Sequence, residues 1–145
     1  VIVKEEITLN GKKHEYKQEQ SIADVNMISQ RIVRVPNSLK TILSFGTAIA
    51  AGTYVAGDIK YVRVTNLDNA NYVTLGLLDS DGSGDRVYFK LEKGETIIFH
   101  NTSVDAKAST STAFEAFVNF DTMNALASDS AGVDIELFVA SSQSS

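Results

Sequence analysis

The residues of this chain that could do chemistry are few, and the most suggestive group is an acidic turn. Residues 79–85 read DSDGSGD, so Asp79, Asp81 and Asp85 could surround a hard cation such as calcium. The segment fails as an EF-hand loop, because its twelfth position is Lys90, where a bidentate acid belongs. Asp, Ser and Gly are equally the residues of a solvated hairpin turn. We therefore expect a turn without a tightly bound metal, with calcium as the alternative.

Other catalytic constellations are missing from the sequence. The two histidines, His14 and His100, have no further ligand at a metal-binding spacing. Cysteine is absent, so thiol catalysis, thiolate metal sites and disulfides are excluded. No nucleophile elbow or phosphate loop is present. Glu92 and Glu95 flank a turn, and Glu115 is expected on the solvent face of a strand, so no carboxylate pair stands out. We expect neither an enzyme nor a cofactor.

Four tyrosines could bind sugar by stacking. They are Tyr54, Tyr61, Tyr72 and Tyr88. Because they are scattered over separate predicted strands, we interpret them as core or interface anchors rather than as one platform.

The elements that would position these residues are strands. Apolar residues alternate at period two in segment after segment, with turn signals at the spacing typical of a sandwich or barrel. The segments are 1–9, 12–19, 31–35, 40–45, 59–66, 72–78, 86–91, 96–100, 114–120 and 133–140. We predict an all-β protein, an antiparallel β-sandwich of jelly-roll type with about eight or nine short strands and very little helix. Its predicted core comprises Val62, Val64, Val73, Leu75, Val87, Phe89, Leu91, Ile97, Phe99, Phe114, Val118, Phe120, Ile135, Leu137 and Val139.

Three stretches are less regular. Ser21 and Asp24 resemble a capping box, which suggests a loop or one helical turn before the strand that ends at Pro36. Residues 46–57 are rich in Ala, Gly and Thr and are predicted to be a loop holding a short extended piece. A helical turn is expected around 123–127, and residues 141–145 form a polar tail.

The chain divides into an N-terminal β-hairpin arm, residues 1–20, and a single β-sandwich domain, residues 21–145. Asn10-Gly11 is a strong hairpin signal, because both turn positions favour positive φ. One parity of the first strand carries Val1, Val3, Ile7 and Leu9, and the polar return strand offers these side chains no partner. We therefore predict that this apolar face is an assembly surface.

Charge limits the partners. The net charge is −5, and residues 41–145 carry six Lys/Arg against thirteen Asp/Glu. A body this acidic, with no basic stripe, argues against nucleic acid as a ligand. No apolar run approaches the ~20 residues that span a bilayer, and no signal peptide is visible, so no membrane partner is expected.

Three segments resemble a known class of proteins. YVRVTNLD at 61–68, NYVTLG at 71–76 and LEKGE at 91–95 resemble motifs of small virion structural proteins of tailed bacteriophages, especially head decoration (cement) proteins. The similarity lies between residues 61 and 95, about a quarter of the chain. It implies a β-sandwich that self-associates, often as a homotrimer, and stabilises a shell by binding the major capsid protein.

The resemblance also implies a location, and two other functions stay open. The location would be the virion, assembled in the host cytoplasm, and a chain without cysteine suits that compartment. One alternative is a carbohydrate- or receptor-binding module of a tail or fibre. The other is a glycosidase-like or cupin-like enzyme, because one sandwich fold hosts many functions.

Overall fold

The protein is all-β in the computed structural model, which describes residues 1–48, 50–79, 86–100 and 120–142. Within these ranges there are eleven strands and one short 3-10 helix, η1 (Ala56–Asp58). The strands are β1 (Ile2–Leu9), β2 (Lys12–Glu19), β3 (Met27–Val35), β4 (Lys40–Gly46), β5 (Thr53–Val55), β6 (Ile59–Asn66), β7 (Val73–Leu78), β8 (Arg86–Leu91), β9 (Thr96–His100), β10 (Thr122–Ala127) and β11 (Val133–Ser141). The predicted fold class is confirmed, with slightly more strands than expected.

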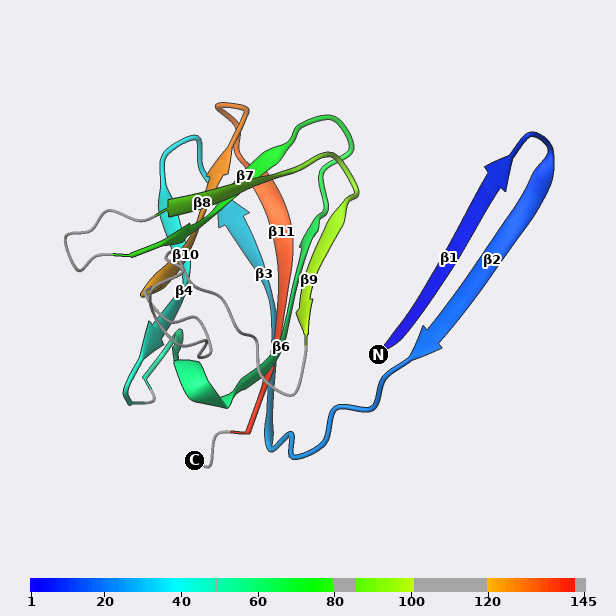
Figure 1. Cartoon of the computed structure of the whole chain (residues 1–145). Helices are drawn as coiled ribbons and strands as arrows, with labels where there is room; N and C mark the ends of the chain where they lie inside the picture. The colour runs from blue at the N-terminus through cyan, green and yellow to red at the C-terminus, as the bar shows by residue number, and fades with distance from the viewer. Residues whose placement is uncertain (49, 80–85, 101–119, 143–145) are drawn as a thin grey trace.

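Nine of these strands build two facing sheets (Figure 1). One has the order β3-β11-β6-β9, and the other has the order β5-β4-β10-β7-β8. The pairs β3–β11, β4–β10, β6–β9 and β7–β8 are antiparallel and nested, the innermost pair being consecutive in sequence. This nesting is the jelly-roll arrangement. The short strand β5 adds a parallel edge beside β4.

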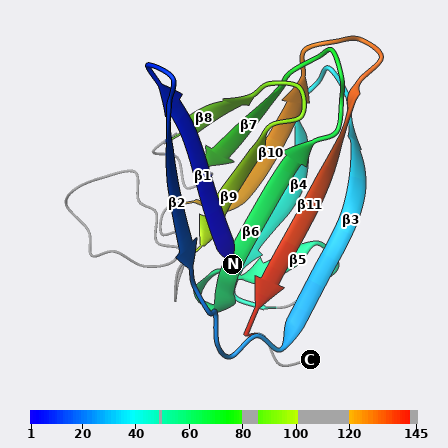
Figure 2. The same cartoon turned by 90° about the vertical axis from the view of Figure 1, so that its right-hand side faces the viewer.

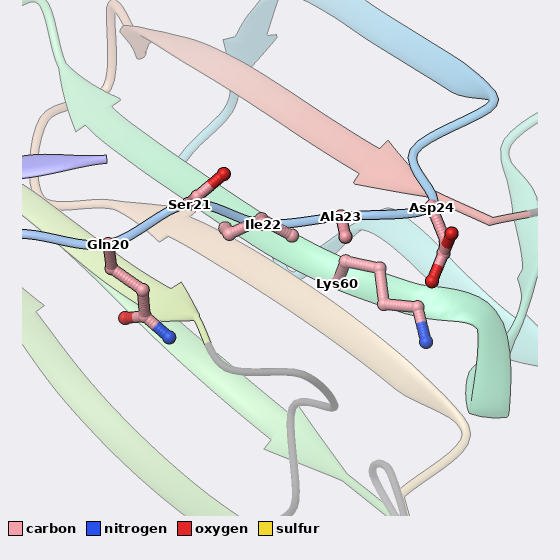
Figure 3. A pocket seen from close by; sticks show the side chains of 6 residues that line it. All are labelled: Gln20, Ser21, Ile22, Ala23, Asp24 and Lys60. Atoms are coloured by element: carbon pink, nitrogen blue, oxygen red, sulfur yellow. The ribbon is translucent and has the colours of Figure 1, made fainter.

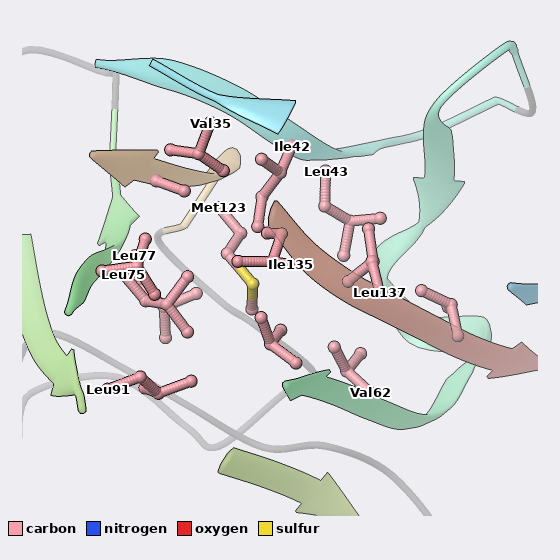
Figure 4. Packing of buried hydrophobic residues seen from close by; sticks show 14 of the residues in the cluster. Val35, Ile42, Leu43, Val62, Leu75, Leu77, Leu91, Met123, Ile135 and Leu137 are labelled. Carbon is pink, nitrogen blue, oxygen red and sulfur yellow. The ribbon is translucent and has the colours of Figure 1, made fainter. Parts of the chain in front are cut away.

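The core fills the space between the two sheets (Figure 4). Alternate residues of β11 point inward, and they meet the inward residues of β7 and β10 from the other sheet. The largest fully buried side chains are Leu43, Ile59, Leu75, Met123, Ile135, Leu137, Val35, Val62, Val64, Val73 and Val133. Period-two alternation therefore supplies one apolar face per sheet, as the sequence predicts.

The helical turn expected around residues 123–127 is wrong. Residues 122–127 form β10, which pairs with β4 on one side and β7 on the other. Its inward residues are Met123, Ala125 and Ala127, so it follows period two, although alanine has low strand propensity. Tertiary pairing on both edges overrides that propensity. For the segment before β3 a loop or one helical turn was expected, and residues 21–26 form the loop, in which Asp24 has a φ of 58° and Asn26 donates its main-chain N–H to Ser141.

Other boundaries and core assignments also differ from expectation. The strand predicted at 31–35 begins earlier, at Met27, because its pairing with β11 continues to Ser141, which is fully buried and not part of a polar tail. Val87 is exposed, because it lies near the open end of edge strand β8. Three predicted core residues are partly buried and pack against the core, namely Phe89, Ile97 and Phe99. Phe120 is buried outside any strand, whereas Phe114 and Val118 lie outside the described residues.

Truncating a core leucine tests this packing. Leu75 is buried on β7, within the cluster shared by both sheets. We expect Leu75→Ala to lower the free energy of unfolding by about 2–5 kcal/mol, because it removes buried methyl groups and leaves a cavity. Leu39→Ala, at an exposed position, is the control and should change stability by less than about 0.5 kcal/mol. Denaturant unfolding measures both, and an equal effect at the two positions would contradict the assigned core.

Candidate assembly surfaces

The arm is a regular two-stranded hairpin. β1 and β2 pair along their full length, from Ile2 opposite Glu19 to Leu9 opposite Lys12. The turn residues Asn10 and Gly11 have φ values of 51° and 76°, which favour Asn and Gly and match the right-handed twist of the strands. The hairpin signal in the sequence is therefore confirmed.

One face of the arm is apolar. Residues directly opposite each other in an antiparallel ladder share a face, so Val3, Ile7 and Leu9 lie with Tyr16 and His14. Ile7, Leu9 and Tyr16 are more than half exposed, while Val1 and Val3 are half-buried. The structure thus puts the predicted assembly residues on one face and adds an aromatic side chain from β2, which the polar composition of β2 concealed.

The opposite face of the arm is charged. Lys13 bridges two carboxylates, those of Glu15 at 2.8 Å and Glu6 at 3.0 Å, and these contacts raise the pKa of Lys13. Lys4 also approaches both carboxylates, and Lys17 pairs with Glu19. Three lysines and three glutamates cancel on this face. Exposed pairs like these contribute little stability.

The arm stands apart from the sandwich, beyond the β3-β11-β6-β9 sheet (Figures 1 and 2). Among the described elements, β1 and β2 make extensive contact only with each other. An isolated two-stranded hairpin is marginally stable in water, because neither of its faces is covered. The apolar face is therefore surface that the described body leaves uncovered.

A second exposed apolar surface lies on the body, on the outer face of the β3-β11-β6-β9 sheet. Ile28 and Ile32, on edge strand β3, are 62% and 69% exposed. The register places Phe138 of β11 and Ile98 of β9 on the same outer face. We call these four residues the outer apolar patch. Sequence analysis missed it, because both parities of β3 carry apolar residues.

The charges around this patch are paired with each other. Arg63 donates to Glu136, which also accepts from Gln30 at 3.1 Å. These hydrogen bonds hold the pKa of the Glu136 carboxyl below its usual value, and the bond from Arg63 has the larger effect. Beside them, Arg34 pairs with Asp134 at 3.1 Å. The outer face therefore has no net charge from these four charged groups, and the Arg63 guanidinium also lies over the Phe138 ring.

A linker, residues 20–26, joins the arm to the body and borders a small pocket (Figure 3). The pocket has a volume of about 140 Å³ and is lined by residues 20–24 and Lys60. This is well below the ~300–1,000 Å³ typical of small-molecule sites. The linker itself is tied down by Asn26, whose side chain donates to Ser142. The arm is thus held at its base while its strands project.

The residues first considered for catalysis are not brought together. Asp79 is buried at the end of β7, while Asp81 and Asp85 lie outside the described residues, so the calcium alternative stays untested. His14 is on the arm and His100 is at the end of β9. Among the described residues no group of three or more His, Cys, Asp or Glu could hold a metal. Nor does the described part contain a helix long and apolar enough to cross a membrane.

The acidic and aromatic candidates also separate. Glu95 accepts from the main-chain N–H of Glu92 within the turn, and Glu115 lies outside the described residues. Tyr54 is in the core, and Tyr61 packs edge-on against Phe138. Tyr72 and Tyr88 are exposed on the outer side of β7 and β8, with Lys90 over the ring of Tyr72. The four tyrosines therefore do not form one platform.

The motif residues that suggested a virion protein stabilise connections between strands. Asn66, fully buried at the end of β6, places its side-chain nitrogen within hydrogen-bond distance of the main-chain oxygens of Asn71, Leu91 and Glu92. Its side-chain oxygen accepts from the N–H of Asp68 at 2.9 Å. One side chain therefore joins the β6–β7 connection to the β8–β9 turn.

Asp68 and Gly94 complete these two turns. The carboxylate of Asp68 accepts from the main-chain N–H groups of Asn71 and Ala70, both at 2.7 Å, and these bonds lower the pKa of Asp68. Gly94 has a φ of 73°, which disfavours any residue with a side chain. These motif residues thus stabilise turns of the jelly roll.

Comparisons with known proteins add little. No family model matches the chain, and no curated protein matches it. Among solved structures, it is similar to a chain from a structure titled "Bacillus endospore appendages form a novel family of disulfide-linked pili". The identity is 14%, the alignment covers 85% of this chain and 94% of that chain, and the TM-score is 0.44. A likeness at this level carries no information about function.

Replacing Asn66 tests the junction it forms. Asn66→Ala leaves buried main-chain oxygens without their donor, and each such loss costs about 1–3 kcal/mol. We expect the free energy of unfolding to fall by at least about 2 kcal/mol, measured by urea denaturation. Asn69→Ala, in the same connection, is the control and should have little effect. A near-neutral Asn66→Ala variant would show that the junction does not hold the two turns.

Acid titration tests Asp68. Because the folded pKa of Asp68 is depressed, its contribution to stability is present above the unfolded pKa of about 4 and is lost as the pH falls through the folded pKa. Asp68→Asn removes this contribution but keeps an acceptor oxygen. We expect the melting temperature of the variant to fall less than that of the wild type between pH 7 and pH 2. Parallel pH profiles would contradict the assignment.

Proposed function

We propose that the protein is a structural subunit that assembles through its N-terminal arm and has no catalytic activity. The observation that carries the proposal is the two-faced arm, with Ile7, Leu9 and Tyr16 exposed on one side and self-neutralised charges on the other. Contiguous exposed apolar surface of this kind marks interaction sites. Ordering the arm also costs backbone entropy, at about 1–2 kcal/mol per residue, which contacts with a partner offset.

The finer proposal is a capsid decoration protein of a tailed bacteriophage. It rests on the resemblance of the segments at 61–68, 71–76 and 91–95 to head decoration proteins. In this proposal the protein forms a homotrimer, binds the major capsid protein and resides in the virion after assembly in the host cytoplasm. A jelly-roll body with an adhesive arm suits that task, because cementing a shell requires contacts and no active site.

Deleting the arm tests the coarser proposal. Every residue of the core cluster lies between Val35 and Val139, so a chain that starts at Gln20 should fold with nearly the same melting temperature. We expect the full chain to form oligomers in light scattering and the deletion variant to be monomeric. We also expect the full chain to bind empty phage capsids, and the deletion variant to bind them less.

The control is the full chain with Thr8→Lys, which changes the charged face of the arm and should leave assembly intact. A wild-type chain that stays monomeric at high concentration and does not bind empty capsids would remove support for both proposals.

Carbohydrate or receptor binding is the second candidate. The observation in its favour is the pair Tyr72 and Tyr88, exposed on the outer side of β7 and β8. Tyr88 lies against Gly76, where an added Cβ would approach the Tyr88 ring to 2.9 Å. A glycan screen separates the candidates, because sugar binding that is lost in Tyr88→Ala and kept after arm deletion would favour this one.

A further inference from the structure

We propose that the apolar face of the arm docks on the outer apolar patch of a second copy of this chain. The inference rests on the proposed arm-mediated assembly and names the surface that receives the arm. That surface comprises Ile28, Ile32, Ile98 and Phe138 on the β3-β11-β6-β9 sheet. Both surfaces expose isoleucines on paired strands, Ile7 on the arm and Ile28 and Ile32 on the patch.

The shapes of the two surfaces agree. The arm face is a two-stranded ribbon, and the patch lies on a sheet whose long edge strand β3 has nine residues, against eight in β1. Sheets pack face to face at about 10 Å with their side chains interdigitating. Ile28 and Ile32 are four residues apart on one face, as are Val3 and Ile7, so apolar side chains recur at the same distance along β3 and β1.

The charges agree as well. Around the patch, Arg63 with Glu136 and Arg34 with Asp134 are already paired, so covering them leaves no bare charge. The apolar face of the arm carries one carboxylate, Glu5 opposite Tyr16, and one ammonium group, Lys12 opposite Leu9. With Val3 and Ile7 aligned on Ile28 and Ile32, the residue midway along the arm, Glu5, lies over Gln30, the residue midway along β3, whose side-chain amide can donate a hydrogen bond to a carboxylate.

Docking on a face explains the exposed side chains better than addition of the arm to a sheet edge. Strand addition pairs main-chain groups and widens a sheet, but it leaves Ile7, Leu9 and Tyr16 on an open surface. Face-to-face docking removes them from water. Edge addition to β3 is therefore an alternative that the experiment must separate.

The buried area indicates how copies combine. Eight residues at about 3.3 Å and two strands at about 4.8 Å give an arm face of ~26 by ~10 Å, so one docked arm buries roughly 500–600 Å² in total. Specific interfaces bury about 1,200–2,000 Å², so a single arm falls short. A closed assembly in which every copy gives one arm and accepts one doubles the area per subunit and leaves no arm uncovered.

The test uses two full-length variants that each lose one side of the contact. Ile7→Lys spoils the arm face, and Ile32→Lys spoils the patch; both positions are more than 60% exposed, so the sandwich should keep its melting temperature. We expect each variant alone to be monomeric in light scattering. An equimolar mixture should show weak, concentration-dependent association that neither variant shows alone, because the intact arm of the Ile32→Lys chain still fits the intact patch of the Ile7→Lys chain through one contact. Thr8→Lys and Leu39→Lys are the matched controls and should assemble like the wild type.

The outcomes separate this inference from the proposed function. If Ile7→Lys is monomeric and Ile32→Lys assembles like the wild type, the arm docks elsewhere, for example on the edge of β3, and the inference is overturned while arm-mediated assembly stands. If the wild type is itself monomeric, because the arm stays free or folds onto its own sheet, both fail.

Crosslinking gives an independent readout. The chain has no cysteine, so single cysteines can be introduced without background. A chain with Ile7→Cys, mixed with a differently tagged chain with Ile32→Cys, should give a mixed crosslink with a short bis-maleimide. Thr8→Cys, on the other arm face, should give much less. Equal yields from the two arm positions would contradict docking through the apolar face.

Discussion

The pairing of the last described strand with two earlier ones is the constraint on which the jelly roll depends. β11 lies between β3 and β6, and each of its inward residues, such as Ile135 and Leu137, sits at the centre of the core. Until the C-terminal part of the chain arrives, β3 has no neighbour in its sheet and β6 has only β9. The nested strand pairs therefore complete the two sheets at the same stage of folding. Because these pairs are distant in sequence, folding should be slow relative to helical proteins of this length.

The sequence predicts this architecture well wherever alternation is clean, and fails where pairing decides the outcome. β11, which alternates from Val133 to Leu137, was expected, and so was β6, although both of its faces carry apolar residues. β10 was not, because Ala125 and Ala127 have little strand propensity and become inward residues only through neighbours on both sides. Val87 alternates correctly but stays exposed, since alternation fixes the face of a strand and not the depth at which each residue lies.

Of the two candidate assembly surfaces, the apolar face of the arm was predictable from the sequence and the outer apolar patch was not. The sequence identifies the apolar parity of β1, because charges separate Val3 from Ile7. It does not identify the outer apolar patch, because Ile28 and Ile32 of β3 are as apolar as Val33 and Val35 on the inner face. Only the register with β11 shows which set faces the other sheet. When an edge strand is apolar on both faces, the sequence alone does not show which face is buried, and the structure is needed to assign it.

The arm and the motif residues both have favourable local structure, but only the motif residues have all their contacts within the fold. Asn66 and Asp68 fit their turns, and every polar group they contact lies within the fold, so resemblance at these positions informs on architecture more than on function. The arm fits its local rules equally well, with a favourable turn and full strand pairing, yet its apolar face is not covered by the described body. A segment that satisfies local structure and leaves apolar surface open is incomplete at the next level of organisation. In the assembly that we propose, that level is contact with a second copy of the chain, whose outer apolar patch matches the arm in length and is flanked by paired charges.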